Sequence, residues 1–111
     1  MSARKDPYGA IADPTRRAIL DLLADHASLT AGEIADEFPD ISRPAVSKHV
    51  RVLREAGLVS VRKDGRELYY ALDVRPLADL YVGWLSRFAP LFDDSLVRLK
   101  QQVEGRARSR R

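Results

Sequence analysis

The sequence predicts one mainly α-helical domain that carries a β-hairpin, an α+β fold, and three patterns support this prediction. Between residues 14 and 56, apolar residues recur at helical spacing in three segments, each preceded by a residue able to cap a helix. Over residues 58–72 the apolar period changes to two around an Asp-Gly pair. Over residues 77–103 the helical period returns. We therefore expect three helices, a hairpin and a long terminal helix, in that order.

The composition is that of a globular protein of one-domain size. The chain has 111 residues, of which 45% are hydrophobic and 32% charged, and it has no cysteine. The missing cysteine excludes disulfides, thiolate metal sites, iron–sulfur clusters and a cysteine nucleophile. The N-terminus lacks the apolar stretch of a signal peptide, and no segment is long enough to span a bilayer. We expect a cytoplasmic protein with a mobile arm (residues 1–7), one domain (residues 8–104) and a basic mobile tail (residues 105–111).

The first two helices are predicted over residues 14–25 and 31–37. Asp13 can accept hydrogen bonds from the free N–H groups of the first helix. Thr30 and Glu33 have the spacing of a capping box at the start of the second helix. The first helix then has an apolar face at i, i+3 and i+4, formed by Ile19, Leu22 and Leu23.

The third helix is predicted over residues 42–56, with Ser42 as its cap and Gly57 as its left-handed terminator. At 100° per residue, one side of this helix is apolar and is formed by Val46, Val50 and Leu53. The opposite side is polar and basic and is formed by Pro44, Ser47, Lys48 and Arg51. The apolar side is expected to pack on the core, leaving the basic side in solvent.

A hairpin is predicted over residues 58–72, with Asp64-Gly65 as a two-residue turn. This turn pairs Val59 with Tyr70, Val61 with Leu68, and Arg62 with Glu67. One face of the hairpin is then apolar, and the other carries a pair of opposite charges. Lys63 and Arg66 flank the turn, at the tip of the hairpin.

The terminal helix is predicted to continue in phase across Pro90, with a kink there and no break. Its apolar positions are Leu77, Tyr81, Trp84, Phe88, Phe92, Leu96, Leu99 and Val103. Such an aromatic stripe is typical of a dimer or domain core. The alternative is a groove around Tyr81, Trp84 and Phe88 that admits an apolar small-molecule effector.

The charge is unevenly distributed along the chain. Residues 6–41 have a net charge of −6, whereas residues 42–66 have a net charge of +5. A basic block of this kind is typical of a surface that binds a polyanion, and the alternative is an unevenly charged solvated surface. The acidic residues Glu33, Asp36, Glu37 and Asp40 are interpreted as a solvated face, because no third type of ligand or catalytic group lies near them.

The order of helices and hairpin is that of a winged helix–turn–helix, in which the second and third helices form the DNA-reading pair. Arg43 lies at the N-terminal end of that helix, where it can make a bidentate contact to guanine. At the hairpin tip, Lys63 and Arg66 can reach a phosphate backbone or a minor groove. His49 borders the buried face, so it either packs in the protein or contacts phosphate. The candidate DNA-binding residues are Ser42, Arg43, Pro44, Ser47, Lys48, His49, Arg51, Arg62, Lys63 and Arg66.

Three segments resemble the ArsR/SmtB family of bacterial transcriptional repressors: ADPTRRAIL (residues 12–20), SRPAVSKHVRVLREAGLV (residues 42–59) and GRELYY (residues 65–70). The resemblance implies a homodimer, paired through its first and last helices, that binds an imperfect palindrome in its own or a neighbouring promoter. It implies DNA contacts at Arg43, Pro44, Ser47, Lys48 and the wing tip. The dimer interface is expected to include Ile11, Leu20, Leu80, Trp84, Phe88 and Phe92.

The metal sites of this family have no counterpart in the sequence. Its Cys-x-Cys pair aligns with Thr30 and Gly32, and its terminal-helix ligands align with Val74, Pro76, Arg87 and Pro90. None of these side chains is a usual zinc or nickel ligand. We therefore expect no metal and no cofactor, and the absence of catalytic motifs predicts that the chain is not an enzyme. An interaction module that does not bind DNA is the alternative function.

Overall fold

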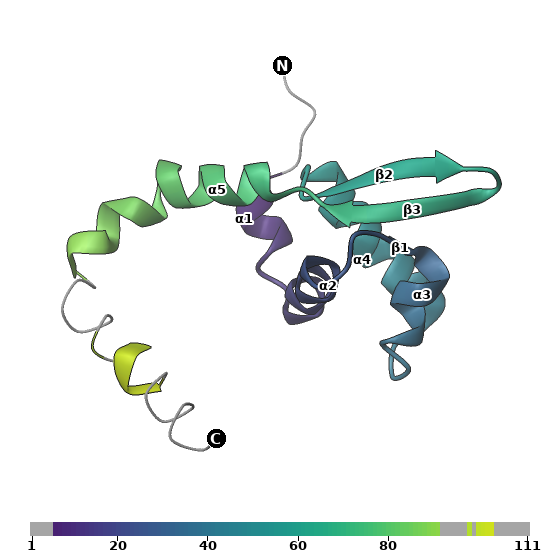
Figure 1. Ribbon diagram of the computed structural model, residues 1–111, viewed down its shortest axis with the longest axis horizontal. Helices are drawn as coiled ribbons and strands as arrows, with labels where there is room; N and C mark the ends of the chain where they lie inside the picture. The colour runs from purple at the N-terminus through teal and green to yellow at the C-terminus, as the bar shows by residue number, and fades with distance from the viewer. Residues whose placement is uncertain (1–5, 92–97, 99, 104–111) are drawn as a thin grey trace. The chain divides into compact units, whose positions relative to one another are not determined.

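The computed structural model describes residues 6–91, 98 and 100–103, and it confirms the predicted α+β fold, with helices and a β-hairpin in the expected order (Figure 1). The chain forms two units, residues 1–79 and residues 80–111. The elements are α1 (Pro7–Ala10), α2 (Pro14–Ala24), β1 (Leu29–Thr30), α3 (Ala31–Asp36), α4 (Arg43–Glu55), β2 (Val59–Asp64), β3 (Glu67–Leu72), α5 (Val74–Gly83) and the 3-10 helix η1 (Leu85–Phe88). No helix in the described part of the chain has the length and apolar character needed to cross a membrane.

The predicted caps begin the helices as expected. The carboxylate of Asp13 accepts the N–H of Arg16 at 3.0 Å, and Ser42 Oγ accepts the N–H of Ala45 at 3.2 Å. Thr30 and Glu33 form the complete capping box of α3, with bonds of 2.9 and 3.1 Å. These bonds satisfy N–H groups that the first helical turn leaves free. The three helices therefore lie within one or two residues of their predicted bounds.

The core of the first unit forms where α4 packs on α2, α3 and β2. Val46, Val50 and Leu53 are 1%, 4% and 0% exposed, which confirms the predicted apolar side of α4. Burial of each such side chain contributes about 1.5–3 kcal/mol relative to exposure. At the end of α4, Gly57 adopts a φ of 81°, as expected for a left-handed terminator, and the chain then enters β2. The orientation of α4 is thus determined by its apolar side.

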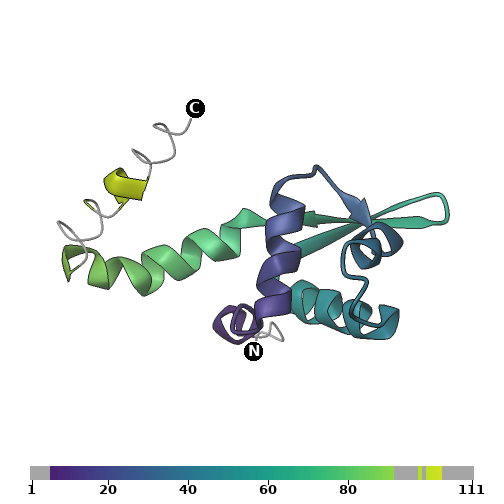
Figure 2. The same ribbon diagram turned by 90° about the horizontal axis from the view of Figure 1, so that it is seen from below.

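The sheet has three strands in the order β1-β3-β2, of which only β2 and β3 were predicted from the sequence. Residues of β1 pair antiparallel with β3, so that Leu29 lies opposite Tyr70. A two-residue strand followed at once by a helix has no detectable alternation. In Figures 1 and 2 the helices α2, α3 and α4 pack around the inner end of the sheet, and the tip of the β2–β3 hairpin extends beyond them.

The predicted hairpin register is wrong by one turn position. The two turn residues are Gly65 and Arg66, and Val61 lies opposite Tyr70 in place of Leu68. Gly65 has a φ of 64°, and no residue other than glycine has a positive φ in the described part of the chain. A turn with glycine at its first central position and a negative φ at the second is type II′, which suits a hairpin as well as the predicted Asp-Gly turn. The shift moves each pair by two residues, so the apolar face is unchanged.

The predicted Arg62–Glu67 pair is consequently not formed. Arg62 lies opposite Tyr69, and its guanidinium carbon is 5.0 Å from the centroid of the tyrosine ring. Its Nη1 atom also lies 3.6 Å from a carboxylate oxygen of Asp64. Glu67 lies opposite Asp64, at the last pair before the turn. Arg62 is thus held by a cation–π contact and an ion pair on its own face of the hairpin.

The terminal helix, predicted to continue with only a kink at Pro90, breaks after Gly83. Helix α5 ends at Gly83, Trp84 has φ −138° and ψ −54°, and the 3-10 helix η1 follows. Glycine in a helix interior costs about 1 kcal/mol relative to alanine, which favours an end at Gly83. The hydroxyl of Ser86 donates to the carbonyl of Val82 at 2.9 Å and satisfies a group that the break leaves free. The predicted positions Phe92, Leu96 and Leu99, most of the N-terminal arm and the basic tail lie outside the described residues.

The cap at Asp13 predicts a pH-dependent part of the stability. The N–H of Arg16 lowers the pKa of Asp13, partial burial opposes this effect, and nearby His49 lowers the pKa further. A carboxylate with a lowered pKa stabilises the fold above its unfolded-state pKa and loses that contribution as the pH falls through its folded-state pKa. Asp13→Asn keeps a capping oxygen but cannot ionise. We expect the free energy of unfolding of the wild type to exceed that of Asp13→Asn at neutral pH, and the difference to shrink below about pH 4. Urea denaturation from pH 7 to pH 3 measures it, and a constant difference would contradict the assignment.

Candidate nucleic-acid interface

The side of α4 away from the core is exposed along its length. Arg43, Pro44, Ser47, Lys48 and Arg51 are all exposed, as the helical spacing predicted. Ser42 precedes them, and its hydroxyl is engaged in capping α4. Because the apolar side is buried in the same helix, these exposed residues form a polar and basic row that other molecules can reach. We call Arg43, Pro44, Ser47, Lys48 and Arg51 the α4 row.

Arg43 makes an ion pair with α3. Its Nη2 atom donates to Oδ1 of Asp36 at 2.8 Å, and both side chains are about two-thirds exposed, at 67% and 66%. An exposed ion pair contributes only about 0–1 kcal/mol. The guanidinium has five N–H donors, so one bond to Asp36 leaves others available at the N-terminal end of α4. Asp36 therefore orients Arg43 and leaves other N–H groups of its guanidinium able to donate hydrogen bonds.

The hairpin adds three exposed basic residues. Lys63 lies on the same side of the sheet as Val59 and Val61, because side chains alternate along a strand. Arg62 lies on the opposite side, and Arg66 is the second residue of the turn. Lys63 and Arg66 thus lie near the tip, whereas Arg62 is held against Tyr69 and Asp64.

His49 does not belong to the α4 row. Its side chain is only 22% exposed, and its Nδ1 atom lies 3.3 Å from Nη1 of Arg16 and 4.0 Å from a carboxylate oxygen of Asp13. Of the two interpretations left open by the sequence, the structure places His49 in packing against the start of α2.

Arg16, which the sequence analysis did not select, connects three helices. Its Nε atom donates to the carbonyl of Ala10 at 2.7 Å, and its Nη2 atom donates to the carbonyl of Gly9 at 3.2 Å. Together with the contact to His49, these bonds tie α1 and the start of α2 to α4. Two features of the sequence pointed to Arg16: it lies in the family-like segment ADPTRRAIL (residues 12–20), and it is one of two Lys or Arg residues in the acidic block 6–41.

A hollow of about 220 Å³ lies between α4 and the sheet. Four of the residues that line it come from α4, and the others come from the start of α3 and from β3: Ser47, Val50, Arg51, Arg54, Ala31 and Tyr70. No carboxylate of the described residues lines it. Arg54 and Tyr70 are not among the binding residues predicted from the sequence, although Ser47, Arg51 and Arg54 have the i, i+4, i+7 spacing of one helix face. We call this cavity the α4–β3 hollow.

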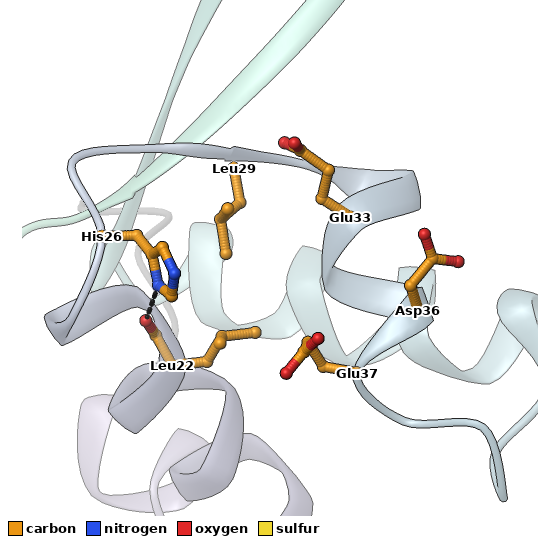
Figure 3. Close-up of a pocket in the computed structure, with 6 residues that line it drawn as sticks. All are labelled: Leu22, His26, Leu29, Glu33, Asp36 and Glu37. Atoms are coloured by element: carbon orange, nitrogen blue, oxygen red, sulfur yellow. Dashed lines mark hydrogen bonds between the residues drawn. The ribbon is translucent and has the colours of Figure 1, made fainter.

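A second hollow, of about 280 Å³, lies between α2 and α3 and is acidic (Figure 3). His26 Nδ1 lies 2.9 Å from the carbonyl of Leu22, a contact typical of a histidine at the end of a helix. Glu33 is engaged in the capping box and Asp36 in the ion pair with Arg43. Among the described residues no group of three or more acidic or histidine side chains could hold a metal ion. Two of these acidic residues, Glu33 and Asp36, thus have protein partners, whereas the sequence analysis interpreted all four as a solvated face.

The residues expected at a dimer interface have different environments. Leu20 and Leu80 are buried, and Ile11 is half-buried against the core. Trp84 is 45% exposed and packs edge-to-face on Phe88, with ring centroids 5.1 Å apart. Phe92 lies outside the described residues. The second unit also exposes several large apolar side chains, namely Tyr81, Val82, Leu85, Leu91 and Val103.

Comparisons with known proteins agree with this geometry. A family model described as a helix-turn-helix domain matches residues 11–62. The transcriptional repressor SdpR of Bacillus subtilis is 40% identical over 89 residues, which cover 80% of this chain and 96% of SdpR. The HTH-type transcriptional regulator Rv2034 of Mycobacterium tuberculosis is 47% identical over 91 residues, covering 79% of this chain and 82% of Rv2034. An ArsR-like transcriptional regulator from Rhodococcus sp. RHA1 has a similar structure, with a TM-score of 0.65, 34% identity, and coverage of 85% of this chain and 86% of that chain.

Proposed function

Because this chain belongs to the ArsR/SmtB family of DNA-binding winged helix–turn–helix transcriptional regulators, we propose that it is a homodimeric repressor. Its operator is an imperfect palindrome in its own or a neighbouring promoter. The observation that carries the proposal is the α4 row, which is polar, basic and exposed on a helix whose other side is fixed in the core. The family consists of transcriptional regulators and not of enzymes. A partner on the chromosome implies that the protein acts in the cytoplasm.

We assign sequence-specific contacts to the N-terminal part of α4. A recognition helix enters the major groove with its first residues directed at base edges. Arg43 is in that position and has free N–H donors, so it can bind O6 and N7 of a guanine. Lys48 follows about one turn later on the same exposed side. His49 is left out of this set because its ring contacts Arg16.

We assign sequence-independent contacts to the hairpin. Lys63 and Arg66 are exposed near its tip and make no ion pair within the described residues. Arginine and lysine side chains that reach a phosphate backbone or minor groove position a protein on DNA and add affinity to every sequence. Arg62 is the weaker candidate of the hairpin because it is held by Tyr69 and Asp64.

We assign dimerisation to the terminal helices. The second unit exposes a set of large apolar side chains, with exposed fractions from 40% for Leu85 to 76% for Leu91. Apolar surface of this kind is typical of an interaction site when it is contiguous. A second copy of the chain covers it in our proposal, and a two-fold symmetric dimer then presents two copies of α4 to the two halves of a palindrome.

The proposed function predicts specific binding to the chain's own upstream DNA. We expect the purified protein to prefer that fragment over a scrambled duplex by about a thousandfold or more at moderate salt. Fluorescence anisotropy with labelled duplexes at two salt concentrations measures the preference. Equal binding to both duplexes with a steep salt dependence would indicate only a basic surface. Absence of binding would favour an interaction module.

The division of roles predicts different effects of two substitutions. Arg43→Ala removes a base contact, so we expect it to weaken operator binding by about 1–3 kcal/mol and to relax selectivity at one base position. Lys63→Ala removes a phosphate contact, so it should weaken binding to all DNA sequences by a similar factor. It should also reduce the magnitude of the slope of log K against log salt concentration by about 1. Binding to a set of operators with single base changes distinguishes the two. Equal losses on all duplexes for both variants would contradict the assignment of α4.

The dimer predicts that a charge on the exposed apolar surface gives a monomer. Val82 is 71% exposed, so Val82→Arg removes no core packing in the isolated chain. We expect this variant to sediment as a monomer, whereas Leu68→Arg, on the hairpin, should sediment as a dimer like the wild type. Sedimentation equilibrium measures the mass of each. A wild type that is monomeric and binds a single half-site with full affinity would refute the dimer.

A further inference from the structure

The α4–β3 hollow combines two cationic side chains with two hydroxyl groups. Ser47, Arg51 and Arg54 lie along one face of α4, and Tyr70 contributes from β3. The hollow, of about 220 Å³, is several times larger than the roughly 30 Å³ that one water molecule occupies in the liquid. It can therefore admit a group of the size of a phosphate together with water.

The two guanidinium groups of the hollow have no protein partner in the part of the chain that the structure describes. Arg16, Arg17, Arg43, Arg62 and Arg75 each bond to a carbonyl, a carboxylate or a ring of the protein. Arg51 and Arg54 make no such contact among the described residues, and no carboxylate lines the hollow. An arginine fork without a partner is suited to bidentate binding of a phosphate.

The hydroxyl groups of the hollow are also available. Neither Ser47 Oγ nor the Tyr70 hydroxyl has a hydrogen-bond partner among the described residues. Every buried side-chain polar atom of the described residues has such a partner. The two hydroxyl groups are therefore not buried and reach solvent. Tyr70 lies on the side of the sheet that faces the core, the side that also carries Lys63 towards the tip. Donors from α4 and from the underside of the hairpin thus border the space between the two DNA-contacting elements.

We propose that the α4–β3 hollow binds a phosphate group of the DNA backbone, with Arg51 and Arg54 as its cationic ligands and Ser47 and Tyr70 as hydrogen-bond donors. The inference rests on the proposed function and extends it to Arg54 and Tyr70, which lie outside the α4 row and the hairpin tip. The contact is independent of sequence because the donors bind phosphate oxygens and reach no base edge. A free phosphate ion has the same chemistry and is the alternative source.

The salt dependence of DNA binding tests the proposal. The logarithm of the binding constant falls with the logarithm of the salt concentration, and each phosphate contact adds about 0.9 to the magnitude of this negative slope. We expect Arg54→Gln to reduce the magnitude of the slope by up to about that amount on both the native and the scrambled duplex, since Arg51 still faces the phosphate. Tyr70→Phe removes a neutral donor, so it should weaken binding to both duplexes by a similar factor without changing the slope. The matched control is Arg75→Gln, which removes the same charge from an exposed arginine paired with Asp73 and should leave the slope unchanged.

The outcomes separate this inference from the proposed function. A wild-type protein that does not prefer its own upstream DNA refutes the proposed function, yet the slopes on any duplex still test the hollow. Equal slopes for the wild type and Arg54→Gln overturn the DNA-phosphate assignment. If inorganic phosphate at matched ionic strength also raises the Tm of the wild type but not of Arg54→Gln, the ligand is free phosphate. Circular dichroism of each variant establishes that the fold is retained, as expected for an exposed arginine.

Discussion

The structure depends on the burial of one side of α4. Val46, Val50 and Leu53 are almost completely removed from solvent where α4 meets α2, α3 and β2. This packing determines the rotation of the helix about its axis, so the α4 row is exposed as a consequence. The same packing places Ser47, Arg51 and Arg54 beside the sheet and creates the α4–β3 hollow. Core formation and presentation of the interface are therefore two results of one apolar stripe.

The arginines of the described residues differ in the protein partners that they have. Arg16 joins α1, α2 and α4 through carbonyl groups and His49, and Arg62 is held by Tyr69 and Asp64. By contrast, Arg51 and Arg54 have no partner among the described residues, and Arg43 has one exposed pair that is weak enough to exchange. Total charge is a poor guide to function here, since the same residue type stabilises the fold in one place and remains available in another.

The differences between the predicted and observed elements have local causes. The hairpin turn moved by one position because Gly65 can begin a type II′ turn as readily as it can end the predicted one. The end of the helix at Gly83 was not predicted, because apolar periodicity shows which residues share a helix face and is insensitive to a break in the backbone. Strand β1 was missed because two residues cannot show alternation, and its pairing with β3 is a long-range contact.

The sequence by itself determined the caps, the apolar side of α4, the basic α4 row and the family, because these features are encoded within a turn or two of the chain or in contiguous motifs. Only the tertiary structure decided what surrounds His49, Arg16, Arg54 and Tyr70. His49 has the spacing of a border residue, and its engagement depends on Arg16, 33 positions earlier in the chain. The α4–β3 hollow likewise forms only when packing brings a face of α4 next to β3. Its lining residues Arg54 and Tyr70 are 16 positions apart in the chain. Spacing specifies neighbours along a helix or strand, whereas contacts between elements arise from packing of the whole core.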